Sequence, residues 1–311
     1  MADIFARIIP ILLLISIGQY FQYKNTFQQS TIDEIKHFIT NVALSAVLFI
    51  AFINMELKAE YFMVFVIVFI LLNVLFFSGF MVSKIKGMNH PLIPFIVTGN
   101  SFGLLGIPLF TTVFGAENVG KLSILGVGHE FFIWLVFITI LRVKFREEKI
   151  SFVVMKDIIK SPLIISIALG ILFNITGLGT FIQENPFSKG FYITLQYLSS
   201  LATPLILIII GYGLKFDKRY MKESVYFLFI RMILGFVIGY AFKMLIIDRI
   251  MSPDPIFNYA YFTFLILPPP LSLPIFMGTY STKEHEELAN NVVVVSTVFS
   301  IVLYILFVLT L

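Results

Sequence analysis

Two clusters of glycine and proline interrupt long apolar stretches of this 311-residue chain. The first reads Gly-Asn-Ser-Phe-Gly-Leu-Leu-Gly-Ile-Pro over residues 99–108, and the second reads Leu-Pro-Pro-Pro-Leu-Ser-Leu-Pro over residues 267–274. Proline removes a backbone donor and clashes with the preceding helical turn, so each cluster is predicted to break a helix. The freed amides and carbonyls need partners, which are either a bound ligand and ions or neighbouring helices that heal a kink.

Polar side chains in and near these clusters are candidates for ligand binding. Asn100 and Ser101 could hydrogen-bond a carboxylate, although the same groups could instead bond a neighbouring helix. Ser45 is a weaker candidate of the same kind. The expected binding residues are Ser45, Asn100, Ser101, Gly106, Pro108, Pro269, Pro270 and Pro274.

Three ionisable residues, His129, Glu130 and Arg231, lie within apolar stretches, where an unpaired charge is costly. Glu130 could carry a coupling proton, because burial favours the protonated form of a carboxyl group. Alternatively, Glu130 is an internal counter-ion whose partner is Arg231. Because successive helical residues point about 100° apart, at most one of His129 and Glu130 faces a given site squarely.

The sequence contains no signature of a soluble enzyme. It has no P-loop, no G-x-G-x-x-G after a strand and no H-E-x-x-H. The run His285-Glu286-Glu287 fits a solvated helix cap better than a metal site, and the absence of cysteine excludes disulfides and thiolate ligands. We therefore expect no catalytic residue, no metal and no cofactor.

Composition indicates that the apolar stretches lie in a membrane. Hydrophobic residues make up 59% of the chain and charged residues 13%, against about 45–50% and about 25% in soluble domains. Runs of about 20 apolar residues suit spanning helices rather than the alternating strands of a barrel. The predicted fold is an all-α membrane protein with ten transmembrane helices at residues 4–21, 37–53, 61–83, 92–114, 121–141, 161–178, 191–214, 222–247, 258–280 and 288–311.

The basic residues indicate topology rather than nucleic-acid binding, because they lie between the spans and form no stripe interleaved with aromatics. Fifteen Lys and Arg fall on one side of the ten spans and six on the other. Positive loops stay cytoplasmic, so we expect a multi-pass protein of the cell membrane with both termini extracellular. The larger group is Lys24, Lys36, Lys84, Lys86, Arg142, Lys144, Arg146, Lys149, Lys156, Lys160, Lys215, Lys218, Arg219, Lys222 and Lys283. The smaller group is Arg7, Lys58, Lys121, Lys189, Lys243 and Arg249.

A charged linker at residues 142–160 divides the chain into two halves, residues 1–141 and 161–311, with five predicted spans each. Because five is odd, the second half must enter the membrane from the opposite face, which makes the halves an inverted repeat. The two Gly/Pro clusters fall in the fourth span of each half, helices four and nine. We expect both to be broken at a crossover near mid-membrane, where half-helix N-termini present positive dipole ends to an anion.

The residues of helix four carry a resemblance to the auxin efflux carrier superfamily, which includes plant PIN-type carriers and prokaryotic malate-permease-like transporters. Residues 100–109 are similar to the family signature of an Asn followed by Gly-x-Pro-Leu, here Gly106-Ile107-Pro108-Leu109. Residues 202–211, which begin Ala-Thr-Pro-Leu, resemble its helix-seven pattern, and Pro269 with Pro274 matches its helix-nine crossover. The resemblance covers essentially the whole chain.

This resemblance implies a secondary transporter of small organic anions, auxin-like or malate-like, that works in the lipid bilayer by alternating access. It also implies a crossover domain and a scaffold domain of helices one, two, six and seven, through which the chain forms a homodimer. Ser45 departs from the proline that many members have in helix two, and the short linker suggests a compact prokaryotic member. The alternatives are a sodium-coupled symporter resembling bile-acid carriers, although helix nine lacks clustered carboxylates, and a receptor that binds without transporting.

Cysteine labelling tests the predicted topology, because the natural chain has no cysteine. An impermeant thiol reagent added to right-side-out cells should label a cysteine placed at Ala2 and should leave Glu147→Cys unlabelled. The reverse pattern would overturn the orientation and the inverted repeat together.

Overall fold

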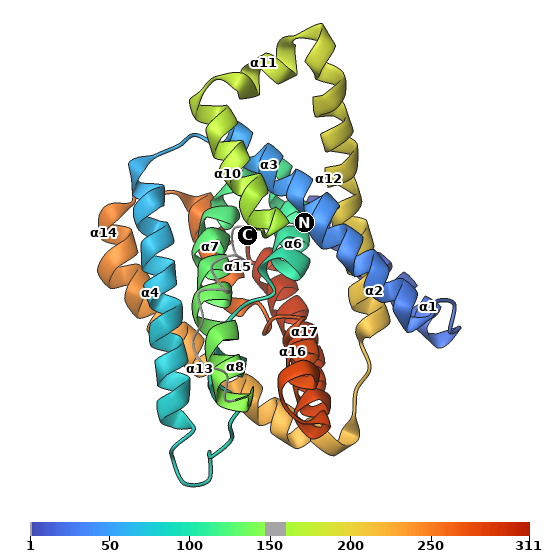
Figure 1. The fold of residues 1–311 in the computed structure, drawn as a ribbon, viewed down its shortest axis with the longest axis vertical. Helices are drawn as coiled ribbons and strands as arrows, with labels where there is room; N and C mark the ends of the chain where they lie inside the picture. The colour runs from blue at the N-terminus through green and yellow to red at the C-terminus, as the bar shows by residue number, and fades with distance from the viewer. Residues whose placement is uncertain (1, 147–159) are drawn as a thin grey trace. The chain divides into compact units, whose positions relative to one another are not determined.

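A computed structural model describes residues 2–146 and 160–311 of the chain. All regular structure in these residues is helical (Figure 1). The helices are α1 Ala2–Tyr23, α2 Gln29–Phe38, α3 Leu44–Asn54, α4 Ala59–Val82, α5 Ile93–Val97, α6 Ile107–Phe114, α7 Val119–Phe132, α8 Ile138–Arg146, α10 Pro162–Ile175, α11 Leu178–Glu184, α12 Pro186–Gly213, α13 Met221–Phe242, α14 Asp248–Ile250, α15 Pro255–Ile266, α16 Leu273–Tyr280 and α17 Lys283–Leu309. Wider π-helical turns follow α2, α7 and α13, and another, Phe102–Gly106, precedes α6.

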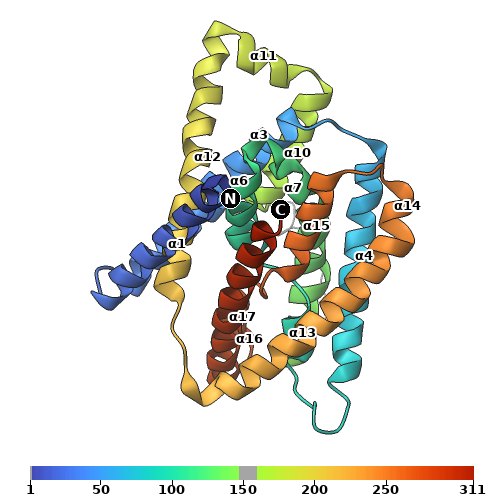
Figure 2. The same cartoon turned by 180° about the vertical axis from the view of Figure 1, so that it is seen from behind.

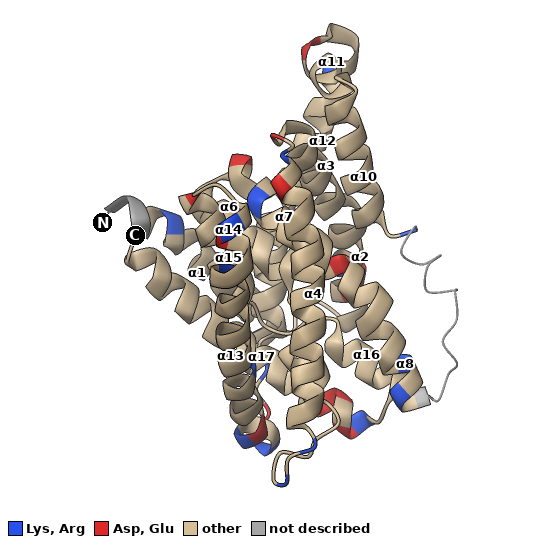
Figure 3. Ribbon diagram, turned by 90° about the vertical axis from the view of Figure 1, so that its left-hand side faces the viewer, with Lys and Arg blue, Asp and Glu red and all other residues tan. Residues whose placement is uncertain are grey.

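Within the described ranges, eight helical stretches are long and apolar enough to cross a membrane, and a ninth counts if α10 and α11, bent by 87°, form one span. The all-α prediction is confirmed, and the predicted spans coincide with these stretches except for residues 258–280. That segment forms the shorter helices α15 and α16, separated by residues 267–272. The tenth span stays a prediction. Figure 3 shows the pattern typical of a spanning helix in α4, which is uncharged along its length after Glu60 in its first turn.

The chain packs as two compact units, and each unit draws on both halves of the sequence. Unit 1 comprises Met1–Leu57, Gly103–Ser123 and Ile158–Leu214, and unit 2 comprises Lys58–Phe102, Ile124–Asp157 and Lys215–Leu311. Unit 1 therefore holds α1–α3, α6 and α10–α12. Unit 2 holds α4, α5, most of α7, α8 and α13–α17. The inverted relation between residues 1–141 and 161–311 stays a prediction, and most of the linker at 142–160 lies outside the described residues.

Glycines bring two helices of unit 1 into backbone contact. Helix α1 packs against α12 and α3 against α10, as Figure 1 shows. A Cβ atom on Gly211 would lie 2.0 Å from the Ile15 carbonyl oxygen, and one on Gly18 would lie 1.9 Å from that of Ile208. Small residues at such interfaces allow close helix packing where lipid removes most of the hydrophobic driving force. The α1–α12 contact is therefore closely packed at the level of the backbone.

Two glycines near the end of α12 form a matched pair for testing this contact. Gly211→Ala must push the two helices apart, so we expect it to destabilise the protein by about 1–3 kcal/mol. Gly213→Ala should cause no loss, because no other element among the described residues comes within 4 Å of a Cβ at that position. Thermal unfolding of the purified proteins in detergent measures the difference, and equal midpoints would show that the contact is not tight.

In unit 2, α5 packs against both α4 and α13. A Cβ atom on Gly79 of α4 would lie 2.9 Å from the Cα atom of Pro94, so only glycine allows α5 to approach α4 this closely. On another side of the unit, α16 and α17 run side by side and α13 packs against α17 (Figure 2). These contacts fix the positions of the segments that follow α5 and α15.

Candidate functional site

Helix four is broken at residues 98–101, directly after α5. Gly99 there has φ +71°, and a Cβ atom on it would lie 2.9 Å from the Pro270 ring, so both conformation and space require glycine. Pro108, which the sequence predicts to be the breaking residue, is instead the second residue of α6. The π-helical turn Phe102–Gly106 leads directly into α6, so Pro108 lies inside a helical stretch that begins after residue 101. The break therefore lies before Pro108.

Helix nine is broken at residues 267–272, where its prolines are concentrated. Pro268, Pro269 and Pro270 all lie in the non-helical segment after α15. Pro274 is the second residue of α16, a position equivalent to that of Pro108 in α6. The two broken helices thus share the order of half-helix, irregular segment and second half-helix, and each second half contains a proline near its start.

The two breaks contact each other through Ser101. Its backbone N–H donates to the Pro268 carbonyl oxygen at 3.0 Å, and its hydroxyl donates to that of Pro269 at 2.7 Å. The same hydroxyl oxygen accepts from the Leu271 N–H at 3.0 Å. Prolines offer carbonyl acceptors but no N–H donors, so Ser101 supplies hydrogen-bond donors that the second break lacks. Backbone groups that the two breaks leave without helical partners therefore form hydrogen bonds across the junction.

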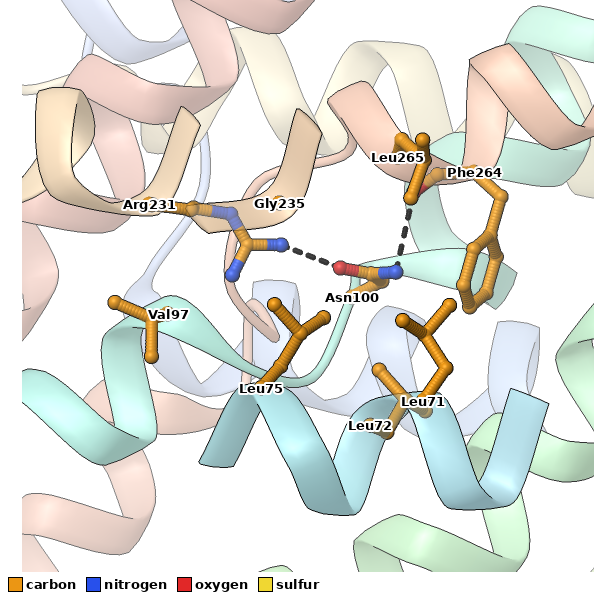
Figure 4. Close-up of a pocket in the computed structure, with 9 residues that line it drawn as sticks. All are labelled: Leu71, Leu72, Leu75, Val97, Asn100, Arg231, Gly235, Phe264 and Leu265. Carbon is orange, nitrogen blue, oxygen red and sulfur yellow. Dashed lines mark hydrogen bonds between the residues drawn. The ribbon is translucent and has the colours of Figure 1, made fainter. Parts of the chain in front are cut away.

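Arg231 of α13, only 3% exposed, joins the same two breaks. Its Nη1 donates to the Ile96 carbonyl at 2.6 Å, and its Nη2 donates to those of Gly99 and Leu267 at 2.9 and 2.7 Å. Nε also donates to Leu267 O at 3.2 Å. In addition, Nη2 contacts Asn100 Oδ1 (Figure 4). One guanidinium thus holds residues from the ends of two half-helices.

The charge of Arg231 is balanced by neutral oxygens. All its hydrogen bonds go to carbonyl or amide oxygens, and no carboxylate pairs with it in the part of the chain that the structure describes. The carbonyls belong to the C-terminal ends of α5 and α15, where a helix dipole is equivalent to up to about half a negative charge. Helix α5 has only five residues, so its free carbonyls contribute more than its dipole.

Asn100 uses its side chain and its backbone N–H within this junction. Its Oδ1 accepts from Arg231, and its Nδ2 donates to the Phe264 carbonyl of α15 at 3.1 Å (Figure 4). Its backbone N–H donates to His129 Nε2 at 2.7 Å. In this conformation the Asn100 side chain therefore hydrogen-bonds protein groups and not a ligand.

His129 is neutral in this arrangement, with its proton on Nδ1. This tautomer follows from the hydrogen bond, because Nε2 must be unprotonated to accept from Asn100. Glu130 Oε1 lies 3.4 Å from His129 Nδ1. The two atoms are not aligned for a hydrogen bond, and Nδ1 has no other partner among the described residues. Glu130 does not pair with Arg231 within those residues, so the counter-ion alternative gains no support from the geometry.

The remaining predicted residues belong to unit 1. Gly106 and Pro108 lie at the start of α6. Ser45, in the first turn of α3, lines a mostly apolar cavity of about 320 Å³ together with Asn41 and Phe173. Of the predicted residues, the structure brings Asn100, Ser101, Pro269 and Pro270 together with His129 and Arg231 in unit 2. The described residues contain no group of three or more His, Asp and Glu side chains placed to bind a metal.

A cavity beside Arg231 and Asn100 has a volume of about 10 Å³, room for about one water molecule. Leu71, Leu72 and Leu75 of α4 line it from one side (Figure 4). It is too small for an organic ligand, so an organic substrate would need a rearranged junction.

Comparison with known families identifies the class of protein. Residues 3–308 match the family model described as membrane transport protein. The chain belongs to the auxin efflux carrier family. A search of curated proteins returns no match. Membership makes this carrier a multi-pass membrane protein that works in a lipid bilayer, and it leaves the substrate unspecified.

Two neutralising substitutions distinguish the roles of the charged residues in this carrier. Arg231→Gln leaves several buried oxygens without a donor, so we expect a loss of roughly 3 kcal/mol of stability. Glu130→Gln should change stability by less than about 1 kcal/mol, because Arg231 does not depend on it. Thermal midpoints in detergent provide the measurement. Glu130 would be the counter-ion if Glu130→Gln were as destabilising as Arg231→Gln and if the double variant regained stability.

Proposed function

We propose that this carrier is a secondary transporter of small organic anions, auxin-like or malate-like carboxylates, that works by alternating access. The observation that carries the proposal is the junction at which two broken helices are held by one buried cation. Discontinuous helices in secondary transporters place substrate and coupling-ion sites at their breaks. Family membership supplies the activity class, and the substrate class and mechanism are inferred.

The division of helix four supports movement by alternating access. Helix α5 belongs to unit 2 and α6 to unit 1, and the chain passes between the units at Phe102 and Gly103. The irregular residues 98–101 precede this passage, and the π-helical turn Phe102–Gly106 contains it. Hinges are short segments of this kind, which absorb changes in backbone angles while packed bodies stay rigid.

The charges at the junction favour an anion. Arg231 cancels the negative ends of α5 and α15, which would otherwise repel a carboxylate. Glu130 lies beside His129, whose Nε2 accepts from Asn100 in the junction. Ionised Glu130 would repel an anion at the junction, and protonation of Glu130 would remove that repulsion. Glu130 is therefore assigned as the residue whose protonation accompanies binding of the substrate.

Ligand-induced stabilisation of the purified carrier tests the substrate class. Malate, other mono- and dicarboxylates and indole acids are compared with their neutral amides as matched controls. A ligand that binds only the native state at 100 times its Kd adds about 2.7 kcal/mol of apparent stability. We expect some acids and none of the amides to stabilise. Equal effects of acids and amides, or no effect of any acid, would contradict the proposal.

Asn100→Ala should weaken binding of a stabilising acid roughly tenfold, because it removes a side chain that orders the junction. Asn73→Ala is the matched control, since among the described residues the Asn73 side chain bonds the Phe69 carbonyl of its own helix α4 and no other group. If both variants bound equally well, the junction would not be the binding site.

Proteoliposomes show whether bound acids are transported and whether Glu130 carries a proton. Uptake by the natural chain should depend on pH, and Glu130→Gln should transport with that dependence lost, because glutamine cannot titrate. Binding without uptake would favour a receptor, and an unchanged pH profile would remove the proton role of Glu130.

A further inference from the structure

We propose that the oxygens around Arg231 form a monovalent-cation site that the guanidinium permanently occupies, so that this carrier takes no sodium ion at its crossover. The oxygens are the carbonyls of Ile96, Gly99 and Leu267 and the Oδ1 atom of Asn100. Removing the guanidinium should convert the same oxygens into a site for Na⁺. The proposal goes beyond the proposed function, because it concerns a cation and needs no organic substrate.

The first argument is the crowding of oxygens around a single nitrogen. Nη2 of Arg231 contacts Gly99 O at 2.9 Å, Leu267 O at 2.7 Å and also Asn100 Oδ1. A guanidinium Nη carries two hydrogens, so three acceptors exceed the number of hydrogen bonds it can direct. Oxygens that converge on one positive centre from separate segments are typical of cation coordination, where the number of ligands is not limited by hydrogens.

The second argument is the origin of these oxygens. Ile96 and Leu267 lie at the C-terminal ends of α5 and α15, and Gly99 lies in the break after α5, where carbonyls have no intrahelical partners. In transporters with broken helices, unwound carbonyls and half-helix C-terminal ends coordinate Na⁺ or accept a proton. Here the equivalent groups bond a side chain of α13. The cation that neutralises the breaks is therefore part of the polypeptide.

The third argument is enclosure. Arg231 is 3% exposed and Asn100 7% exposed. The adjoining cavity of about 10 Å³ leaves no room for a hydrated ion beside the guanidinium. Oxygens bind a hard cation such as Ca²⁺ at about 2.3–2.6 Å, so an ion at the Nη2 position needs the cage to contract by a few tenths of an ångström. Loss of the long arginine side chain provides space for that ion and for water.

The test measures the thermal stability of purified protein in rising NaCl, with choline chloride holding the ionic strength constant and no organic acid present. The natural chain should show no specific response to Na⁺. Arg231→Ala should be less stable in choline chloride and should regain several degrees of its midpoint as Na⁺ saturates the site. Adding Asn100→Ala removes a ligand, so the Na⁺ concentration for half-maximal effect should rise roughly tenfold.

Arg231→Lys is the matched control, because it keeps a tethered cation and should gain no sodium response. Low concentrations of guanidinium chloride should also stabilise Arg231→Ala, since the free ion replaces the lost group. Saturable stabilisation of the natural chain by Na⁺ would overturn the proposal, and this arm remains informative if Arg231→Ala fails to fold. A folded Arg231→Ala that responds to neither Na⁺ nor guanidinium would overturn it as well.

Discussion

The structure of unit 2 depends on one constraint, that backbone groups released by a broken helix must be bonded where water is scarce. In the described part of unit 2, the breaks of helices four and nine meet, and each break alone would leave carbonyls without donors. Ser101 and Arg231 donate hydrogen bonds to these carbonyls, in place of the backbone N–H groups of a continuous helix. Because both residues contact both breaks, neither break can be closed or displaced independently of the other.

This constraint also explains the local sequence. Glycine stands at position 99 because a positive φ and the nearby Pro270 ring exclude a side chain. Asn100 combines an acceptor for Arg231 with a donor for Phe264, which no aliphatic residue of similar size could do. The leucines of α4 close the junction on one side and keep the local dielectric low. Low dielectric strengthens each of these bonds and raises the cost of losing any one of them.

Much of the fold could be predicted from the sequence because membrane spans have a strong hydropathy signal. The division of residues 258–280 into α15 and α16 could be predicted as well, because consecutive prolines break a helix. The site was harder to predict. Asn100 and Ser101 stood out as polar residues, and Arg231 stood out as a charge in an apolar span. The partners of Arg231 are mostly backbone carbonyls of residues such as Ile96 and Leu267, whose side chains give no indication of that role.

The π-helical turn Phe102–Gly106 has a consequence for the phase of helix four. A π turn contains one residue more than an α-helical turn, and each residue of a helix advances by about 100°. The side chains of α6 are therefore rotated relative to those that an uninterrupted continuation would present. Deleting a single residue between Ser101 and Pro108 would rotate Thr111 away from α12. The hydroxyl contact between Thr111 and Thr203, at 3.2 Å, would then be lost. The length of this segment is thus more tightly constrained than the identity of most of its residues.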